Sequence, residues 1–126
     1  TQLALNNGSY AGKTYWKSVV ESQFIAPLSS DDSYGLGWRR VGAKHSYAPF
    51  GHYASNLAYG HTGWTGTVTL IDPKYNLIIV LLTNKKHSTY RNGQFAGDGF
   101  ATGKYAPIID LIYQALPETQ SFPTTK

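Results

Sequence analysis

The sequence predicts an α+β fold in which an antiparallel β-sheet is flanked by helices. Residues 66–71 are rich in β-branched side chains and predict a strand. Residues 72–75 read Asp-Pro-Lys-Tyr, which is typical of a turn, and an apolar run over 77–83 predicts a second strand. Residues 105–116 combine an early proline with an apolar stripe and predict a helix. These segments together indicate a sheet with a helix packed on it.

The sheet is expected to be built around residues 34–41, 59–71 and 76–84. The apolar run at 77–83 shows no alternation, so we expect a strand that is buried on both faces. Residues 34–41 alternate between apolar and polar or small side chains, with glycines that favour close backbone packing.

Helices are predicted near both ends of the chain. Leu3, Ala4 and Leu5 favour a helix that stops at Asn7-Gly8, so we expect the chain to begin in the last turn of a longer helix. A short helix is expected over 14–24, and the helix at 105–116 should bury one apolar face. That face consists of Ile108, Leu111, Ile112 and Ala115.

The remaining segments are expected to be loops within a single domain. Residues 42–58 are mostly Gly, His, Ser, Tyr and Pro, and 86–104 contain glycines without apolar periodicity. We expect residues 1–117 to form one partial domain and residues 118–126 to form a flexible tail.

Composition excludes several classes of protein. The 126 residues contain 41% hydrophobic and 14% aromatic side chains, which is typical of a globular chain. No apolar run reaches the length of about 18 residues that a transmembrane segment needs, and the first residues do not show the basic and apolar pattern of a signal peptide. The absence of cysteine removes disulfides, thiol nucleophiles and Cys-based zinc sites.

The net charge of +4 comes from scattered Lys and Arg side chains. This pattern favours a solvated basic surface, and no nucleic-acid partner is expected because no recognised motif accompanies the charge. Weak attraction to an anionic cell wall or membrane surface remains an alternative.

The stretch from Tyr59 to Thr67 is the candidate site. It reads Tyr-Gly-His-Thr-Gly-Trp-Thr-Gly-Thr and so combines three glycines with hydroxyl, imidazole and indole groups. Glycines allow a backbone to approach a ligand closely, and the intervening side chains supply chemistry at that point.

Other kinds of site are disfavoured by spacing. The four histidines show no His-x-x-x-His or His-x-Glu pattern, so we expect no metal, and nothing in the chain calls for a cofactor. No Gly-x-Ser-x-Gly elbow exists, and the acidic residues are too dispersed for paired-carboxylate glycoside chemistry.

The candidate stretch resembles the third motif of the serine β-lactamase and penicillin-binding-protein superfamily. The resemblance is to the branch of class C-like β-lactamases, D-alanyl-D-alanine peptidases and related esterases, where Lys-Thr-Gly or His-Thr-Gly borders the active site. It extends over nearly the whole chain, through Leu5 to Lys13, the Tyr-Gly-Leu-Gly-Trp segment at 34–38, Leu70 to Pro73, and Leu77 to Asn84 with Lys85 and His87. The resemblance implies the C-terminal portion of the β-lactamase/transpeptidase-like fold.

The family's nucleophile motif is missing. No Ser stands three residues before a Lys, and Thr14-Tyr15-Trp16-Lys17 lies where the family has no nucleophile. Tyr90-Arg91-Asn92 spells the family's second motif, but it follows the third motif instead of preceding it, which favours coincidence. Whether this chain is itself an enzyme is therefore left open, and the parent is expected to be a serine hydrolase.

The resemblance implies roles for four residues. His61 would stabilise developing charge or bind a substrate carboxylate, and Thr62 would offer its hydroxyl to the same carboxylate or to the catalytic network. Gly63 would let the substrate backbone lie against the strand. The backbone N–H of Trp64 would be one of two oxyanion-hole donors. Imidazole in place of the usual Lys weakly favours a peptidase or esterase over an efficient β-lactamase.

The sequence thus predicts the C-terminal piece of a penicillin-recognising serine hydrolase that acts on cell-wall peptide, β-lactam or ester substrates and is inactive alone. Its location is expected to be extracytoplasmic or at the bacterial cell surface. The edge of the 76–84 strand is expected to self-associate or to pair with an N-terminal segment. The alternative is a non-catalytic module that binds peptidoglycan or carbohydrate through Tyr and Trp side chains.

Overall fold

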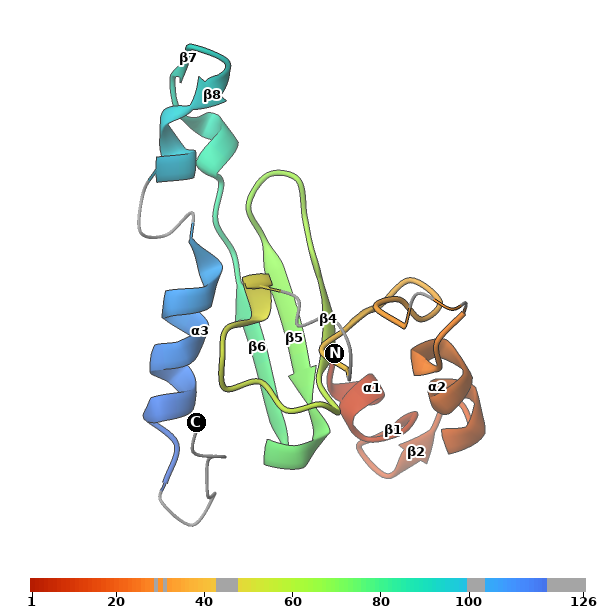
Figure 1. Ribbon diagram of the computed structural model, residues 1–126. Coiled ribbons are helices and arrows are strands. Elements are labelled where there is room, and N and C mark those ends of the chain that lie inside the picture. Colours follow the sequence, from red (N-terminus) through yellow and green to blue (C-terminus); the bar gives the residue numbers. More distant parts are fainter. Residues whose placement is uncertain (29, 31, 43–47, 100–103, 118–126) are drawn as a thin grey trace.

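A four-stranded antiparallel sheet lies at the centre of the molecule (Figure 1). The computed structural model describes residues 1–28, 30, 32–42, 48–99 and 104–117. The strand order is β3-β4-β5-β6, so neighbours in the sheet are also neighbours in the sequence. The strands are β3 (Arg39–Arg40), β4 (Tyr59–Thr62), β5 (Val68–Asp72) and β6 (Leu77–Leu81).

Helices and two small hairpins surround this sheet (Figure 1). The α-helices are α1 (Gln2–Leu5), α2 (Ser18–Ile25) and α3 (Tyr105–Gln114). The hairpins join β1 (Ser9–Tyr10) to β2 (Lys13–Thr14) and β7 (Tyr90–Arg91) to β8 (Gln94–Phe95). The 3₁₀ turns are η1 (Ala48–Phe50), η2 (Pro73–Tyr75), η3 (Lys85–His87) and η4 (Ala96–Gly99). The predicted α+β class is confirmed.

The two faces of the sheet pack against different layers. On one face, Leu70 and Ile79 are register partners and share a core with Ile109 of α3. On the other face, Tyr59 and Ile71 are register partners and pack around Ala4 of α1. Because successive side chains of a strand point to opposite faces, each strand serves both cores. We call these the α3 face and the α1 face.

Helix α3 begins where the sequence predicts it, but it buries a different set of side chains. Tyr105, Ile109 and Tyr113 are buried, whereas Leu111 of the predicted apolar face is 65% exposed. These three residues are spaced by four and therefore lie along one stripe of the helix. Tyr113 is drawn inward by a hydrogen bond from its hydroxyl to the buried carboxylate of Asp72, at 2.7 Å. The expected face is therefore wrong in part, because Ile112 does pack against the core, whereas the buried stripe runs through Tyr105, Ile109 and Tyr113.

Strand β6 is not buried on both faces, contrary to the expectation. Ile79 is buried against the α3 layer, whereas Val80 on the opposite face is 51% exposed. The strand is also the last in the sheet and pairs only with β5 in the part of the chain that the structure describes. Its continuous apolar character therefore reflects a surface that the described residues do not cover.

The predicted strand at 34–41 is reduced to the two residues of β3. Tyr34 forms an isolated bridge with Arg39, and Gly37 between them has φ +82°. A positive φ turns the chain, so residues 35–38 make a tight reversal instead of extended strand. The alternation in the sequence marks this reversal, and the strand prediction is wrong for most of the segment.

Two further segments differ from expectation for local reasons. Helix α2 starts at Ser18 and not at Thr14, because Thr14 pairs with Ser9 in the β1–β2 hairpin. The expected loop at 86–104 contains the β7–β8 hairpin, in which Asn92 has φ +52° and Gly93 has φ +80°. An Asn-Gly pair is a strong hairpin signal that the loop interpretation overlooked.

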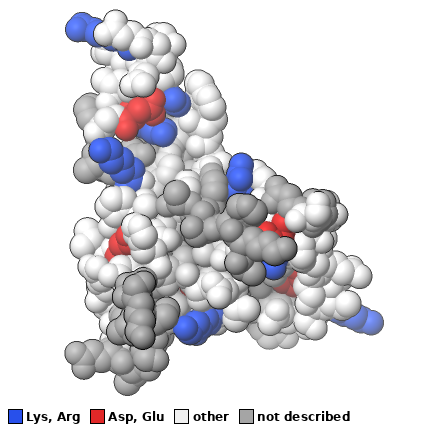
Figure 2. Space-filling model, viewed as in Figure 1, with Lys and Arg blue, Asp and Glu red and all other residues white. Residues whose placement is uncertain are grey.

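The expected flexible tail at 118–126 lies outside the described residues. No helix in the described ranges is long and apolar enough to cross a membrane. Figure 2 shows Lys and Arg side chains spread over the visible face, with the densest basic group next to acidic atoms.

Candidate functional site

Strand β4 brings His61 and Thr62 to the point where the chain turns back into β5. Gly60 makes this pairing possible, because a Cβ at that position would lie 2.1 Å from the carbonyl oxygen of Thr69. His61 is the register partner of Thr69, and Thr62 is the partner of Val68. Strand β4, which carries the predicted site residues, can therefore lie this close to β5 only because residue 60 has no side chain.

The turn after β4 is held by its own backbone. The N–H of Gly63 donates to the carbonyl of Thr67 at 2.8 Å, and the N–H of Gly66 donates to the carbonyl of Gly63 at 3.1 Å. Gly66 has φ +115°, and its carbonyl accepts a hydrogen bond from the Thr83 hydroxyl. The glycines in the motif thus form a tight reversal that is tied to the chain after β6.

The imidazole of His61 is exposed and its tautomer is defined by a neighbour. Its Nδ1 lies 2.8 Å from the carbonyl oxygen of Thr62, which can only accept, so Nδ1 carries the proton. In the neutral ring, Nε2 is then the atom that can accept a hydrogen bond or a proton. Tyr59 and His61 are two residues apart, so His61 lies on the α1 face of the sheet.

Thr62 and Gly63 are placed differently from His61. Alternation puts Thr62 on the α3 face, opposite to His61, so the two side chains do not share a face. What all these residues share is the outer edge of β4. Among the described residues, strand β3 pairs with Tyr59 and Gly60 and does not continue along this edge.

The backbone N–H of Trp64 continues this open edge. In the described part of the chain, it donates no hydrogen bond to another residue, whereas the neighbouring N–H groups of Gly63 and Gly66 do. A free N–H in a fixed turn is a suitable donor for an oxyanion. The indole itself is 74% exposed, and its ring packs edge-on against Phe95 at 6.2 Å between centroids.

A basic cluster that the sequence analysis missed supports this turn. The Nζ of Lys86 lies 5.3 Å from the Trp64 ring centroid and 4.5 Å from that of Phe95. Lys85 and Lys86 both contact the carboxylate of Asp98, at 3.1 and 3.3 Å. The β7–β8 hairpin therefore packs beside the candidate site. The sequence shows the two lysines as an adjacent pair, but its spacing does not predict that the Asp98 carboxylate contacts both of them.

The same cluster shifts two pKa values. The hydrogen bond from Lys85 has the largest effect on the pKa of Asp98 and lowers it below 3.8. Burial raises this pKa by a smaller amount, and the contacts with Lys86 lower it further. Burial lowers the pKa of Lys85, but its contacts with Asp98 and Tyr105 outweigh this and raise it above 10.5. Both groups are therefore charged across the neutral range.

A buried carboxylate lies at the other end of β5 from the candidate site. Asp72 is fully buried and accepts hydrogen bonds from four donors on three other residues. Ser55 donates from its N–H at 2.9 Å and from its hydroxyl at 2.6 Å, and the Tyr113 hydroxyl and the Lys74 N–H complete the set. Ser55 is thus occupied in a structural network that joins η2, α3 and the segment before β4.

Within the described residues, no group of three His, Asp or Glu side chains gathers where it could hold a metal ion. The residues brought together at the β4 edge are instead backbone donors, one imidazole and one exposed indole. Such a set can align an extended ligand and stabilise negative charge on an oxygen atom.

Comparison with known proteins places the chain in a family. Residues 4–99 match the model of the Beta-lactamase family, which covers the sheet, the candidate site and the β7–β8 hairpin. The chain therefore belongs to the beta-lactamase family, a family of serine hydrolases, and the resemblance stated from its motifs is confirmed.

Curated relatives are similar over almost the whole chain. It is 48% identical over 120 residues to an N-acetylmuramyl-L-alanine amidase of Bacillus subtilis (strain 168), covering 91% of this chain and 27% of the relative. It is 38% identical over 122 residues to a putative D-alanyl-D-alanine carboxypeptidase of Escherichia coli (strain K12), covering 93% and 28%. The chain thus spans little more than a quarter of the length of these relatives.

Proposed function

We propose that this chain supplies one wall of the active site of a penicillin-recognising serine hydrolase that works through an acyl-enzyme. The open edge of β4 carries the proposal. Strand β3 ends at the level of Gly60, and beyond it lie His61 and the N–H of Trp64, which donates to no other residue in the described part of the chain. An extended peptide or a β-lactam amide can add to such an edge through backbone hydrogen bonds.

The geometry suggests a role for each residue along this edge. The N–H of Trp64 would donate to the oxygen of the acyl group as it becomes negative, a contact that contributes about 3–4 kcal/mol in a working hydrolase. His61 would present Nε2 to a substrate carboxylate or to the proton-transfer network. Gly63 would let the substrate backbone lie against the strand, and the Thr62 hydroxyl, on the other face from His61, would contact the substrate carboxylate or the catalytic network.

The nucleophile and its base belong to another segment in this proposal. The sequence contains no Ser-x-x-Lys, and Ser55 is committed to Asp72. These 126 residues by themselves should therefore form no acyl-enzyme. The similarity to an N-acetylmuramyl-L-alanine amidase and to a putative D-alanyl-D-alanine carboxypeptidase favours cell-wall peptide as substrate and an extracytoplasmic location.

A labelling experiment tests the proposal on the protein at its full encoded length. Incubation with fluorescent penicillin and with a fluorophosphonate probe should give a covalent adduct on a serine outside the 126 residues. His61→Gln should slow acylation about 10- to 100-fold, because it removes the imidazole at the edge. The matched variant His87→Gln, which changes an exposed histidine of η3, should label at the normal rate.

Two outcomes would contradict the proposal. An adduct on a serine within this chain would show that the nucleophile is not supplied from elsewhere. Absence of labelling, together with saturable binding of cell-wall fragments that Trp64→Ala abolishes, would favour the non-catalytic binding module.

We further propose that the edge of β6 takes a strand from outside the described residues. Strand β6 pairs on one side only in the described sheet, and Val80 is half exposed. The added strand would come from an N-terminal segment of a longer chain or, without it, from a second copy.

A further inference from the structure

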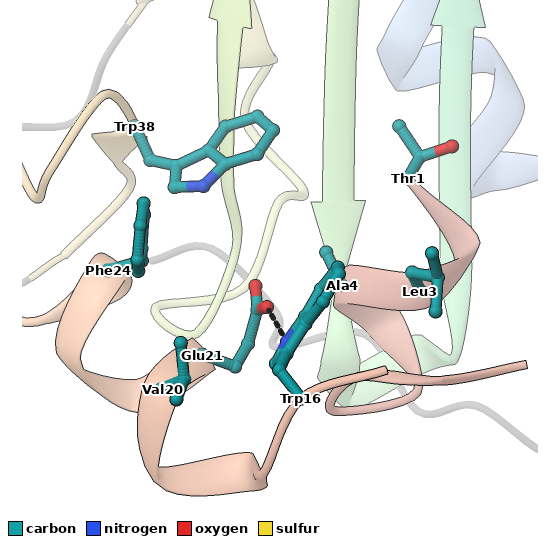
Figure 3. A pocket seen from close by; sticks show the side chains of 8 residues that line it. All are labelled: Thr1, Leu3, Ala4, Trp16, Val20, Glu21, Phe24 and Trp38. Carbon is teal, nitrogen blue, oxygen red and sulfur yellow. Dashed lines mark hydrogen bonds between the residues drawn. The ribbon is translucent and has the colours of Figure 1, made fainter. Parts of the chain in front are cut away.

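A hollow lies on the α1 face, apart from the edge of β4. It is a cavity of about 400 Å³ between α1, α2 and the reversal that precedes β3. Figure 3 shows the indoles of Trp16 and Trp38 and the ring of Phe24 around it, with the Glu21 carboxylate between them. Its volume falls in the range that small-molecule sites occupy.

Glu21 is an unusual residue to find buried at this place. It is 5% exposed and is the one buried side chain of α2, whereas Val19 and Phe24 of the same helix are 55% and 42% exposed. A helix that packs on a core usually turns its apolar side chains towards the core and its carboxylates towards solvent. The orientation of α2 therefore directs a negative charge into the hollow.

The partners of this carboxylate are all neutral in the described structure. Trp16 Nε1–H donates to Oε2 at 3.1 Å, and the Tyr59 hydroxyl donates to Oε1 at 3.2 Å. No Lys, Arg or His of the described residues forms an ion pair with Glu21. Two neutral donors orient the carboxylate without balancing its charge, and each oxygen retains capacity to accept another hydrogen bond.

The aromatic walls favour the same kind of ligand as the carboxylate does. A cation over an indole or phenyl face is attracted by the ring quadrupole, and tryptophan is the strongest of these partners. Trp38 is held in place by an edge-on contact with Tyr59, at 5.5 Å between ring centroids. The hollow thus combines aromatic walls, an apolar lining and one oriented negative charge.

We propose that this hollow is a binding site for an organic cation, a primary amine with an apolar body. The ammonium group would donate to Glu21 and lie against Trp16, while the apolar body would pack on Phe24 and Trp38. This site is separate from the acyl-transfer chemistry of the β4 edge and does not depend on it. The structure holds the elements of the site in place through the Trp16–Glu21–Tyr59 hydrogen bonds.

The test compares two probes of nearly equal shape on the protein at its full encoded length. Benzylamine carries the cation, and benzyl alcohol is its neutral counterpart. Binding is followed by the indole ¹⁵N–¹H resonances of tryptophan-labelled protein, with the Trp16 signal identified from Trp16→Phe. We expect benzylamine to shift the Trp16 and Trp38 signals saturably and to leave that of Trp64 unchanged. It should bind at least about tenfold more tightly than benzyl alcohol.

Variants separate the charge from the shape of the hollow. Glu21→Gln should weaken benzylamine binding at least about tenfold and leave benzyl alcohol binding unchanged, which also shows that the hollow is still formed. Asp110→Asn removes one negative charge from α3 and should change neither affinity. Equal affinity of the two probes, or an absence of any Trp16 shift, would overturn the proposal. The latter result would be expected if another segment fills the hollow.

Discussion

Asp72 shows how one residue connects distant parts of this chain. Its carboxylate accepts hydrogen bonds from Ser55, which precedes β4, and from Tyr113, which lies 41 residues further on in α3. The same side chain caps η2 through the N–H of Lys74. A buried carboxylate is tolerated when several donors satisfy it, and here these donors come from three different elements.

Two buried tyrosines should make the protein sensitive to alkaline pH. Burial, followed by the hydrogen bond and charge of Asp72, raises the pKa of Tyr113 well above 10, and burial followed by Glu21 raises that of Tyr59. The unfolded chain releases these protons near pH 10 while the folded chain retains them. Stability should therefore be unaffected below about pH 9 and should fall as the pH rises through 10.

Urea denaturation between pH 8 and 11 measures this effect. Tyr113→Phe should reduce the alkaline loss of stability, at a cost of about 1 kcal/mol at neutral pH for the lost hydrogen bond. Tyr10→Phe changes an exposed tyrosine and should leave the pH dependence intact. An identical alkaline slope in Tyr113→Phe and in the parent protein would argue against the role of Tyr113.

Gly60, the one glycine in the four strands of the sheet, should not tolerate a side chain. A Cβ there would meet the Thr69 carbonyl oxygen at 2.1 Å, as well as Phe50 Cζ at 3.0 Å, and backbone atoms of the neighbouring strand cannot move away cheaply. We expect Gly60→Ala to cost about 3 kcal/mol or more of unfolding free energy. In Gly99→Ala the new Cβ meets nothing within 4 Å, so the cost should be small. Similar midpoints of urea unfolding for the two variants would refute this prediction.

At the scale of elements, the candidate site depends on the mismatch in length between β3 and β4. The two residues of β3 pair with the beginning of β4, and in the described ranges β3 does not extend beyond Gly60. Phe95 of the β7–β8 hairpin and Lys86 of η3 both contact the exposed indole of Trp64 in the turn. The site is therefore formed by an interruption of the sheet and a separate hairpin.

The packing of this hairpin should loosen in acid. The pKa of Asp98 is lowered chiefly by Lys85, so its contribution is present above about pH 4 and is lost as the pH falls through the lowered value. Between about pH 5 and 9 the Asp98 carboxylate and the Lys85 ammonium group both stay charged. The indole ¹⁵N–¹H resonance of Trp64 should thus be constant in this range and should shift below pH 4.

Asp98→Asn is the variant that tests this interpretation. At neutral pH this variant should already give the Trp64 resonance that the parent protein shows in acid. Its Trp64 resonance should then not shift further when the pH is lowered below 4. Asp110→Asn, which changes a carboxylate of α3 beside His52, should retain the acid step. A step of unchanged size in Asp98→Asn would assign it to a different group.

At the scale of the whole molecule, the sheet has one well-covered face and one partly open face. Helix α3 covers Leu70 and Ile79, whereas the α1 face is closed around Tyr59 and Ile71 but leaves Val80 half exposed. His61 and Val80 both lie on this open part, since each is paired with Thr69 in the register. The candidate site therefore borders the surface that the described residues leave uncovered.

The open edge of β6 should make the 126-residue chain associate. An unpaired apolar strand edge is a template for another strand, so sedimentation equilibrium should show a dimer or larger species. Val80→Lys places a charge on the edge strand and should shift the equilibrium towards monomer by at least about tenfold. Leu111→Lys alters an exposed position of α3 and serves as the control. A monomer at all concentrations, with the edge amides protected from exchange, would contradict the prediction.

Much of the candidate site could be predicted because its signal is local. The His-Thr-Gly-Trp stretch and the family were both identified from adjacent residues, and the family match confirms the second. The structure places the stretch at the end of β4. The opposite faces of His61 and Thr62 follow from alternation once the strand is known. The supporting cluster could not be predicted, because Asp98 and Lys86 are 12 residues apart across a hairpin that was read as a loop.

The sequence by itself determined the α+β class, the β5–turn–β6 unit, the position of α3 and the candidate stretch, because β-branching, turn chemistry and helix spacing act between near neighbours. Only the tertiary structure decided the shortness of β3, the buried stripe of α3 and the inward charge of Glu21. These features depend on contacts between distant residues, such as Tyr59 with Glu21 and Tyr113 with Asp72. A buried polar group takes its partner from whichever element packs beside it, and sequence spacing does not contain that information.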